Sequence, residues 1–179
     1  MSTFRFAIMG AGNIAHQFCD AVTLVEDCEV SAIASKDLGR AQKFAEECSV
    51  AHAYDNYEQM LIEEKPDCVY IAVTPNDHFR LTMLCLEHRV PVLCEKAMFT
   101  NSAEAKAVFE KAEKDQTFVM EAMWSRFLPA VNQAKKWAAE GKIGRLEALQ
   151  GRIGFLAPEG ADNRYHSPLL CGGAATDIT

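Results

Sequence analysis

Short apolar runs alternate with longer amphipathic stretches along the first two thirds of the chain. The apolar runs have the continuous character of strands that are buried on both faces of a parallel sheet. Between them, apolar side chains recur at the three- and four-residue spacing of helices. The pattern predicts strands at residues 4–9, 28–34, 51–54, 68–73, 90–94 and 118–122, and helices at 13–24, 38–47, 56–64, 78–88 and 101–115. Such alternation predicts an α/β fold with a doubly wound parallel sheet.

The pattern changes after Ala122. Residues 128–140 predict an amphipathic helix, residues 146–155 a long strand and residues 171–175 the start of another helix. A lone strand cannot form a sheet, because it needs a pairing partner and a covered face. We therefore expect one complete domain at 1–122 and the start of a second, α+β domain at 123–179, which is truncated or depends on a partner.

A glycine-rich turn separates the first predicted strand from the first predicted helix. Residues 10–15, Gly-Ala-Gly-Asn-Ile-Ala, have the spacing G-x-G-x-x-G/A of a dinucleotide-binding loop in a Rossmann domain. Gly10 would allow the tight turn, Gly12 would let the backbone lie against a pyrophosphate, and Ala15 would let the helix pack closely on the sheet. The free N–H groups at the helix start favour phosphate. Candidate cofactor-binding residues are Gly10, Gly12, Asn13 and Ile14; the alternative is a structural turn that binds nothing.

The end of the second strand is where such domains distinguish NAD from NADP. An NAD-binding protein usually places Asp or Glu there to hold the ribose 2′-hydroxyl. This chain has Ser35 and Lys36, followed by Arg40, and a hydroxyl with two cations suits a 2′-phosphate. The residues favour NADP, with NAD as the alternative because Asp37 could also reach the ribose or, like Ser35, cap the next helix. The non-functional alternative is that Lys36 and Arg40 are solvated side chains at a helix start. A methyltransferase is disfavoured, because it would be expected to have an acidic ribose-binding residue where Ser35 and Lys36 stand.

Glu95 and Lys96 directly follow the fifth predicted strand. Ligands of open α/β sheets bind beyond the carboxyl ends of strands, so Lys96 would face the cleft near Thr74, Pro75 and Asn76. A lysine in such a place can move a proton to or from a carbonyl or hydroxyl oxygen, and Glu95 could orient it. The alternative is a surface Glu–Lys pair on a turn.

Composition excludes several other classes. The 179 residues carry a net charge of −7 without a basic run, which argues against a nucleic-acid partner. No run approaches the length of a membrane span, and the first five residues lack the apolar core of a signal peptide. The seven cysteines form no C-x-x-C pair, which predicts reduced thiols in a cytoplasmic protein. Cys85 and His88 share a helix face, but zinc needs more than two ligands, so we expect no metal site.

Several motifs together resemble the oxidoreductase family that includes glucose–fructose oxidoreductase and inositol dehydrogenase (Gfo/Idh/MocA). The residues that carry this resemblance are 10–15, 34–36, 74–78 and 94–96. Residues 120–129 resemble more specifically the dimeric dihydrodiol dehydrogenase branch, and residues 172–178 resemble the family's glycine-rich helix start. The resemblance implies an NAD(P)-dependent dehydrogenase that transfers a hydride between nicotinamide and a secondary alcohol or carbonyl of a sugar, polyol or trans-dihydrodiol. It also implies a homo-oligomer. A non-catalytic NAD(P)-binding regulator or fragment on the same fold is the alternative.

The resemblance also implies roles for individual residues. Lys96 matches the catalytic lysine, although Ala97 stands where the family usually has a proline, often after a cis bond. Asp177 matches the acid before a second catalytic His or Tyr, which would fall beyond Thr179. His78 matches the family motif and either borders the site or caps its helix. The positions matched to the cofactor or the domain junction are Thr74, Pro75, Asn76, Glu95, Trp124 and Arg126. Trp124 could instead belong to a core or interface. Tyr165 and His166 are expected to be loop residues, with a substrate contact as the alternative.

Overall fold

A six-stranded parallel sheet forms the centre of the molecule. The computed structural model describes residues 3–160 and 163–173. The strands are β1 (Phe4–Met9), β2 (Cys28–Ala34), β3 (His52–Tyr54), β4 (Cys68–Ile71), β5 (Val92–Glu95) and β6 (Val119–Ala122). Their order in the sheet is β3-β2-β1-β4-β5-β6, and every neighbouring pair is parallel. The prediction of a doubly wound parallel α/β sheet is confirmed.

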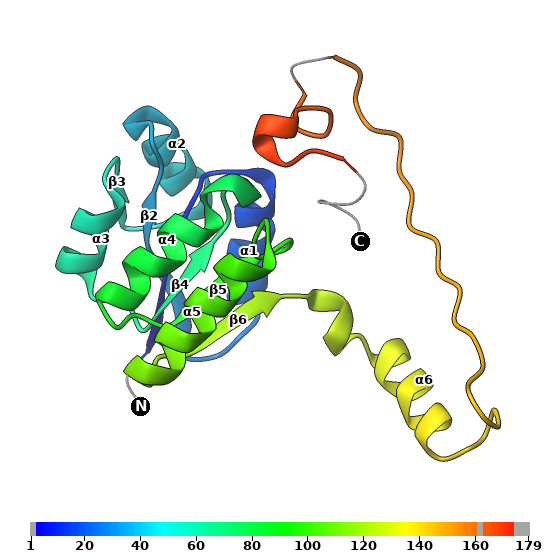
Figure 1. Cartoon of the computed structure of the whole chain (residues 1–179). Coiled ribbons are helices and arrows are strands. Elements are labelled where there is room, and N and C mark those ends of the chain that lie inside the picture. The colour runs from blue at the N-terminus through cyan, green and yellow to red at the C-terminus, as the bar shows by residue number, and fades with distance from the viewer. Residues whose placement is uncertain (1–2, 161–162, 174–179) are drawn as a thin grey trace.

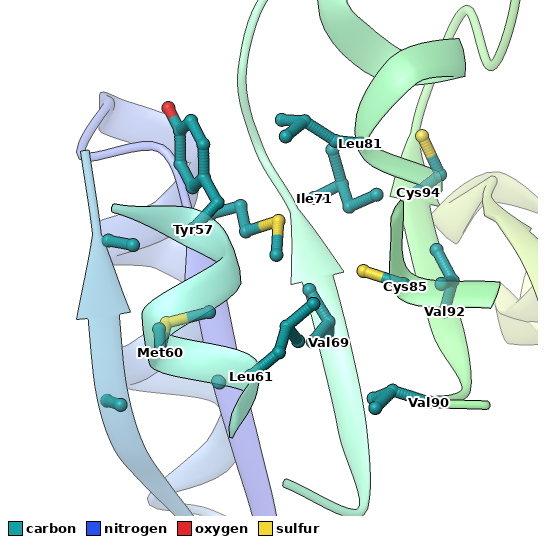
Figure 2. Packing of buried hydrophobic residues seen from close by; sticks show 14 of the residues in the cluster. Tyr57, Met60, Leu61, Val69, Ile71, Leu81, Cys85, Val90, Val92 and Cys94 are labelled. Carbon is teal, nitrogen blue, oxygen red and sulfur yellow. The ribbon is translucent and has the colours of Figure 1, made fainter. Parts of the chain in front are cut away.

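Five helices cover the two faces of the sheet (Figure 1). They are α1 (Asn13–Val22), α2 (Leu38–Cys48), α3 (Tyr57–Glu64), α4 (Pro75–Glu87) and α5 (Ser102–Asp115). Side chains of α1 and α2 form one core cluster with the sheet, and side chains of α3 and α4 form another. Figure 2 shows this second cluster, in which Met60 and Leu61 of α3 face Val69 of β4, with Leu81 and Cys85 of α4 beyond. Both faces are therefore buried, which explains why the strand sequences are almost continuously apolar.

Polar caps fix where several helices begin. Asp37 accepts a hydrogen bond from the backbone N–H of Arg40 at 2.7 Å, so Asp37 rather than Ser35 caps α2. Asn101 caps α5 in the same way, through the N–H of Glu104 at 3.0 Å. Helix α4 begins at Pro75, three residues before the predicted start at His78, because the fixed φ angle of proline suits the first helical position.

The chain beyond β6 contains less regular structure than the sequence predicts. It forms a 3₁₀ turn at Trp124–Phe127, helix α6 at Pro129–Ala139 and a second 3₁₀ turn at Pro168–Leu170. The strand predicted at 146–155 is wrong: these residues have no strand partner, and Leu149 and Ile153 are 89% and 77% exposed. Alternating apolar residues form a strand only where another strand supplies hydrogen bonds. Figure 1 shows this segment running at a distance from the sheet, between α6 and the 3₁₀ turn at Pro168–Leu170. Most of the predicted helix start at 171–175 lies within a turn or outside the described residues.

Candidate cofactor-binding cleft

A cavity of about 580 Å³ lies at the carboxyl ends of the central strands. Strands β1 and β4 are neighbours, but the chain leaves β1 toward β2 and leaves β4 toward β5. The connections therefore diverge at this point, which opens a crevice where α/β proteins bind ligands. Its lining comes from the glycine turn, the ends of β2, β4 and β5, the first turns of α2, α3 and α4, and a distant loop. The lining residues are Gly10, Ala11, Gly12, Asn13, Ile14, Ser35, Lys36, Arg40, Tyr57, Ala72, Val73, Thr74, Pro75, Asp77, Glu95, Lys96, Arg164 and Tyr165. We call this cavity the cleft.

The glycine turn is shaped by two different requirements. Gly10 has a φ of +110°, and a Cβ there would lie 2.7 Å from the carbonyl oxygen of Ala72, so the fold itself needs glycine. At Gly12 a Cβ would meet only that same oxygen, at 3.9 Å, so its surface toward the cleft is open. Helix α1 begins after Gly12 without a side-chain cap and without an acidic residue in its first turn. The exposed N–H groups and this absence of competing charge fit a pyrophosphate.

The predicted ribose site lies beside that turn. Ser35 is 5% exposed. Its backbone N–H donates a hydrogen bond to the backbone carbonyl oxygen of Tyr54 at 3.0 Å, which fixes the end of β2. Arg40 reaches back over the glycine turn, with Nη2 3.4 Å from the carbonyl oxygen of Ala11. Lys36 lines the cleft, and its ammonium group pairs with the carboxylate of Asp77. The two cations predicted from the sequence are therefore present at one end of the cleft.

Asp77 and Tyr57 line the cleft but do not stand out in the sequence. The other oxygen of Asp77 accepts from Nε of Arg80 at 3.3 Å, and the Arg80 guanidinium lies 5.9 Å from the ring centre of Tyr57. Burial raises the pKa of Asp77, but its hydrogen bond to Lys36 and the nearby positive charges outweigh that effect and hold its pKa below the ordinary value. Burial also raises the pKa of Tyr57. The one available signal for Asp77 was its place inside the motif at 74–78.

Glu95 and Lys96 lie at the opposite end of the cleft, and both are half-buried. The hydroxyl of Tyr70 donates to Oε1 of Glu95 at 2.5 Å, and the backbone N–H of Lys96 donates to Oε2 at 3.3 Å. Burial and the bond to Glu95 raise the pKa of Tyr70, so its hydroxyl remains a donor. The Lys96–Ala97 peptide bond is cis, although Ala97 replaces the usual proline. These contacts fix the Glu95 carboxylate next to the backbone that carries Lys96.

His78 is fully buried and does not line the cleft. One ring nitrogen lies 3.0 Å from the carbonyl oxygen of Val73 and the other lies 3.0 Å from that of Ala97. Val73 follows β4 and Ala97 follows β5, so the imidazole links the two segments that end at the cleft. The sequence suggested that His78 either borders the site or caps its helix. The structure shows neither role directly, because the ring contacts the backbone of the segments that follow β4 and β5.

The other predicted residues divide between the cleft and its surroundings. Thr74 and Pro75 line the cleft, whereas Asn76 is exposed on the first turn of α4. Trp124 is 71% exposed, and Arg126 lines a second cavity of about 610 Å³ beside α5 and β6. Asp177 lies outside the described residues.

The distant loop reaches the cleft through two of its residues. Arg164 and Tyr165 line the cleft, with the Arg164 guanidinium 4.2 Å from the Tyr165 ring centre, whereas His166 is exposed. The sequence predicts Tyr165 as a loop residue, with a substrate contact as the alternative, because nothing local shows that this loop returns to the sheet.

Fold and cleft together define a dinucleotide-binding Rossmann domain. Residues 4–123 match the family described as "Oxidoreductase family, NAD-binding Rossmann fold". The chain belongs to this Gfo/Idh/MocA family of NAD-binding oxidoreductases.

Curated relatives and solved structures agree with this assignment. The chain is 36% identical over 153 residues to trans-1,2-dihydrobenzene-1,2-diol dehydrogenase of Mus musculus, covering 84% of the chain and 46% of that protein. It is 31% identical over 178 residues to the Danio rerio enzyme of the same name, covering 97% and 52%. The chain thus spans about half the length of the curated relatives it matches.

Two solved structures illustrate the structural similarity. An NAD-binding protein from Listeria innocua superposes with a TM-score of 0.86 over 99% of the chain and 52% of its own, at 22% identity, which shows the fold alone. A 3-ketoreductase variant from Actinomadura kijaniata, in complex with TDP-benzene and NADP, has a TM-score of 0.74 at 26% identity, covering 80% of the chain and 44% of its own.

Among the described residues, none of the helices combines the length and apolar character needed to cross a bilayer.

Proposed function

We propose that this chain forms the cofactor-binding part of an NADP(H)-dependent dehydrogenase that acts on a secondary alcohol or carbonyl group. The observation that carries the proposal is the composition of the cleft, which brings the glycine turn, two cations and Lys96 to one cavity. A trans-dihydrodiol, sugar or polyol is the proposed substrate class. The names of the curated relatives support the first of these.

The lining offers groups for the pyrophosphate, the 2′-phosphate and the nicotinamide end of NADP(H). The backbone at Gly10 to Ile14 would hold the pyrophosphate, and Lys36 with Arg40 would hold the 2′-phosphate, because two cations suit a dianion. Thr74, Pro75 and Glu95 would border the nicotinamide end. By family resemblance we also propose cofactor contacts for Asn76, Trp124 and Arg126, although these three do not line the cleft. For the buried His78 we propose a role at the cofactor site through the segments that follow β4 and β5, whose carbonyl oxygens its ring contacts. When bound, the nicotinamide supplies the hydride chemistry.

Lys96 is the proposed proton carrier. Its Nζ would donate a proton to the substrate oxygen during reduction and accept it during oxidation. The Tyr70 hydroxyl bond to Glu95 and the Glu95 bond to the Lys96 N–H hold the backbone of this lysine in place. Asp177 is proposed to belong to the same acid–base machinery.

The setting of the enzyme is also part of the proposal. All seven cysteines are free thiols, which suits the reducing cytoplasm. We propose a cytoplasmic homo-oligomer with a small-molecule substrate, in line with the resemblance to the dimeric branch.

Cofactor titration and one substitution test the proposal. NADPH fluorescence should change on mixing with this chain, and NADPH should bind more tightly than NADH. In the protein that carries this chain, Lys96→Ala should leave NADPH affinity unchanged and lower kcat by about 10²–10⁴-fold, the usual contribution of a positioned proton donor. Lys106→Ala is the matched control, because Lys106 is exposed on α5 away from the cleft. Full turnover by Lys96→Ala would refute the role of Lys96, and binding without turnover on any dihydrodiol, sugar or polyol would favour a non-catalytic regulator.

A further inference from the structure

An ion-pair network lies in the cleft, at the end that holds Lys36 and Arg40. Lys36 follows β2 and Asp77 lies in the first turn of α4, 41 residues later, yet their side chains meet. Arg80 binds the second oxygen of Asp77 at 3.3 Å and stacks toward Tyr57. Lys36, Tyr57 and Asp77 all line the cleft. A carboxylate therefore stands beside the cation that the proposed function assigns to the 2′-phosphate.

We propose that Asp77 determines cofactor specificity: it competes with the 2′-phosphate for Lys36 and so lowers the preference for NADP(H) over NAD(H). This inference rests on the proposed function, because it concerns the same cleft. It adds a residue and a direction of effect that the cations alone would not suggest.

The two partners differ in how far each can move. The Lys36 side chain is 66% exposed, so its ammonium group can turn toward a bound phosphate without a change in the backbone. The Asp77 side chain is only 17% exposed and is held on its other oxygen by Arg80. Its carboxylate thus stays in the cleft whether or not Lys36 leaves it.

Charge and hydrogen bonding act in the same direction. A monoester phosphate carries about −1.5 to −2 charge near neutral pH, so the fixed carboxylate of Asp77 repels it and holds the lysine that would neutralise it. The 2′-hydroxyl of the adenosine ribose, which NAD(H) has and NADP(H) carries as a phosphate ester, can instead donate a hydrogen bond to a carboxylate. Removal of the Asp77 charge should therefore strengthen NADP(H) binding and weaken or leave unchanged NAD(H) binding.

Dissociation constants for NADPH and NADH, measured by fluorescence on the chain and its variants, test this inference. Asp77→Asn keeps the shape of the side chain and should raise the ratio of the NADH constant to the NADPH constant by about tenfold, or about 1.4 kcal/mol. Asp115→Asn is the matched control, because Asp115 pairs with Lys111 at 2.8 Å on α5 and does not line the cleft. An unchanged or lowered ratio in a folded Asp77→Asn variant overturns the inference. Failure of the wild-type chain to bind either dinucleotide refutes the proposed function itself.

A measurement on the wild-type chain covers the case in which Asp77→Asn does not fold. The carboxyl carbon of Asp77 can be titrated by NMR with 2′,5′-ADP or with 5′-ADP present. If the 2′-phosphate draws Lys36 away, the pKa of Asp77 rises with 2′,5′-ADP and not with 5′-ADP. The same pKa with both nucleotides would overturn the inference.

Discussion

Replacing Gly10 with alanine separates the structural role of the glycine turn from its role in binding. The φ of +110° at Gly10 is a region that a side chain makes unfavourable by about 1–3 kcal/mol. The added Cβ would also lie 2.7 Å from the oxygen and 2.8 Å from the carbon of the Ala72 carbonyl. These are backbone atoms that cannot rotate away, and such overpacking costs a further 1–3 kcal/mol or so. We expect a loss of about 4 kcal/mol, within a total stability of roughly 5–15 kcal/mol.

Thermal unfolding by circular dichroism measures this loss. At about 2–4 °C per kcal/mol for a domain of this size, Gly10→Ala should lower Tm by roughly 8–16 °C. Gly12→Ala is the matched control, because its φ is −106° and its Cβ would meet only one atom, at 3.9 Å. That variant should keep Tm within about 2 °C of wild type, since surface changes away from strained positions have small effects, but should bind NADPH more weakly. Equal Tm values for the two variants would refute the steric argument.

Substitutions at three further positions probe the charges and caps of the fold. Glu64→Gln should lower the free energy of unfolding, measured by urea denaturation, by about 2–3 kcal/mol. The reason is that the buried Glu64 carboxylate pairs with the Arg5 guanidinium at 2.8 Å, and glutamine removes the negative charge of that pair. An unchanged midpoint of urea unfolding would contradict this. Asp37→Ala should cost about 1 kcal/mol in the same assay by removing the cap of α2, and Asp37→Ser should restore it. The Glu47 carboxylate raises the pKa of His16 above its ordinary value of 6.5, so the pair adds stability below that pH that is lost as pH rises through the raised pKa. The Tm difference between wild type and His16→Asn should therefore shrink from about pH 6 to about pH 8.5, and a constant difference would count against the pair.

Most of the first domain was predictable because its signals are local. Apolar runs define the strands, caps such as Asn101 define helix starts, and the spacing at 10–15 defines the turn. The observed strand order, β3-β2-β1-β4-β5-β6, is the common order of dinucleotide-binding sheets that begin with such a glycine loop. The segment at 146–155 was predicted wrongly because a strand depends on a pairing partner as well as on its own sequence.

The cleft was predictable only where a residue belongs to a recognisable motif. Glycine spacing and the strand-end cations indicated one end, and Lys96 indicated the other. Asp77 was missed because its partner Lys36 is 41 residues away, and only the sheet order brings the two together. For His78, no local pattern indicates that the ring is buried between the carbonyl oxygens of Val73 and Ala97, which follow two different strands.

The lining of the cleft has a consequence for how such proteins can diversify. Among the described lining residues, only Arg164 and Tyr165 lie beyond Lys96 in the sequence. The lining proposed for the pyrophosphate and the 2′-phosphate, together with the proposed proton carrier, thus lies within residues 10–96. Gene fusion or recombination beyond β6, where the sheet is complete, can attach this unit to a different second half. Each such exchange would present new substrates to the proposed redox chemistry, without requiring the nucleotide site to evolve again.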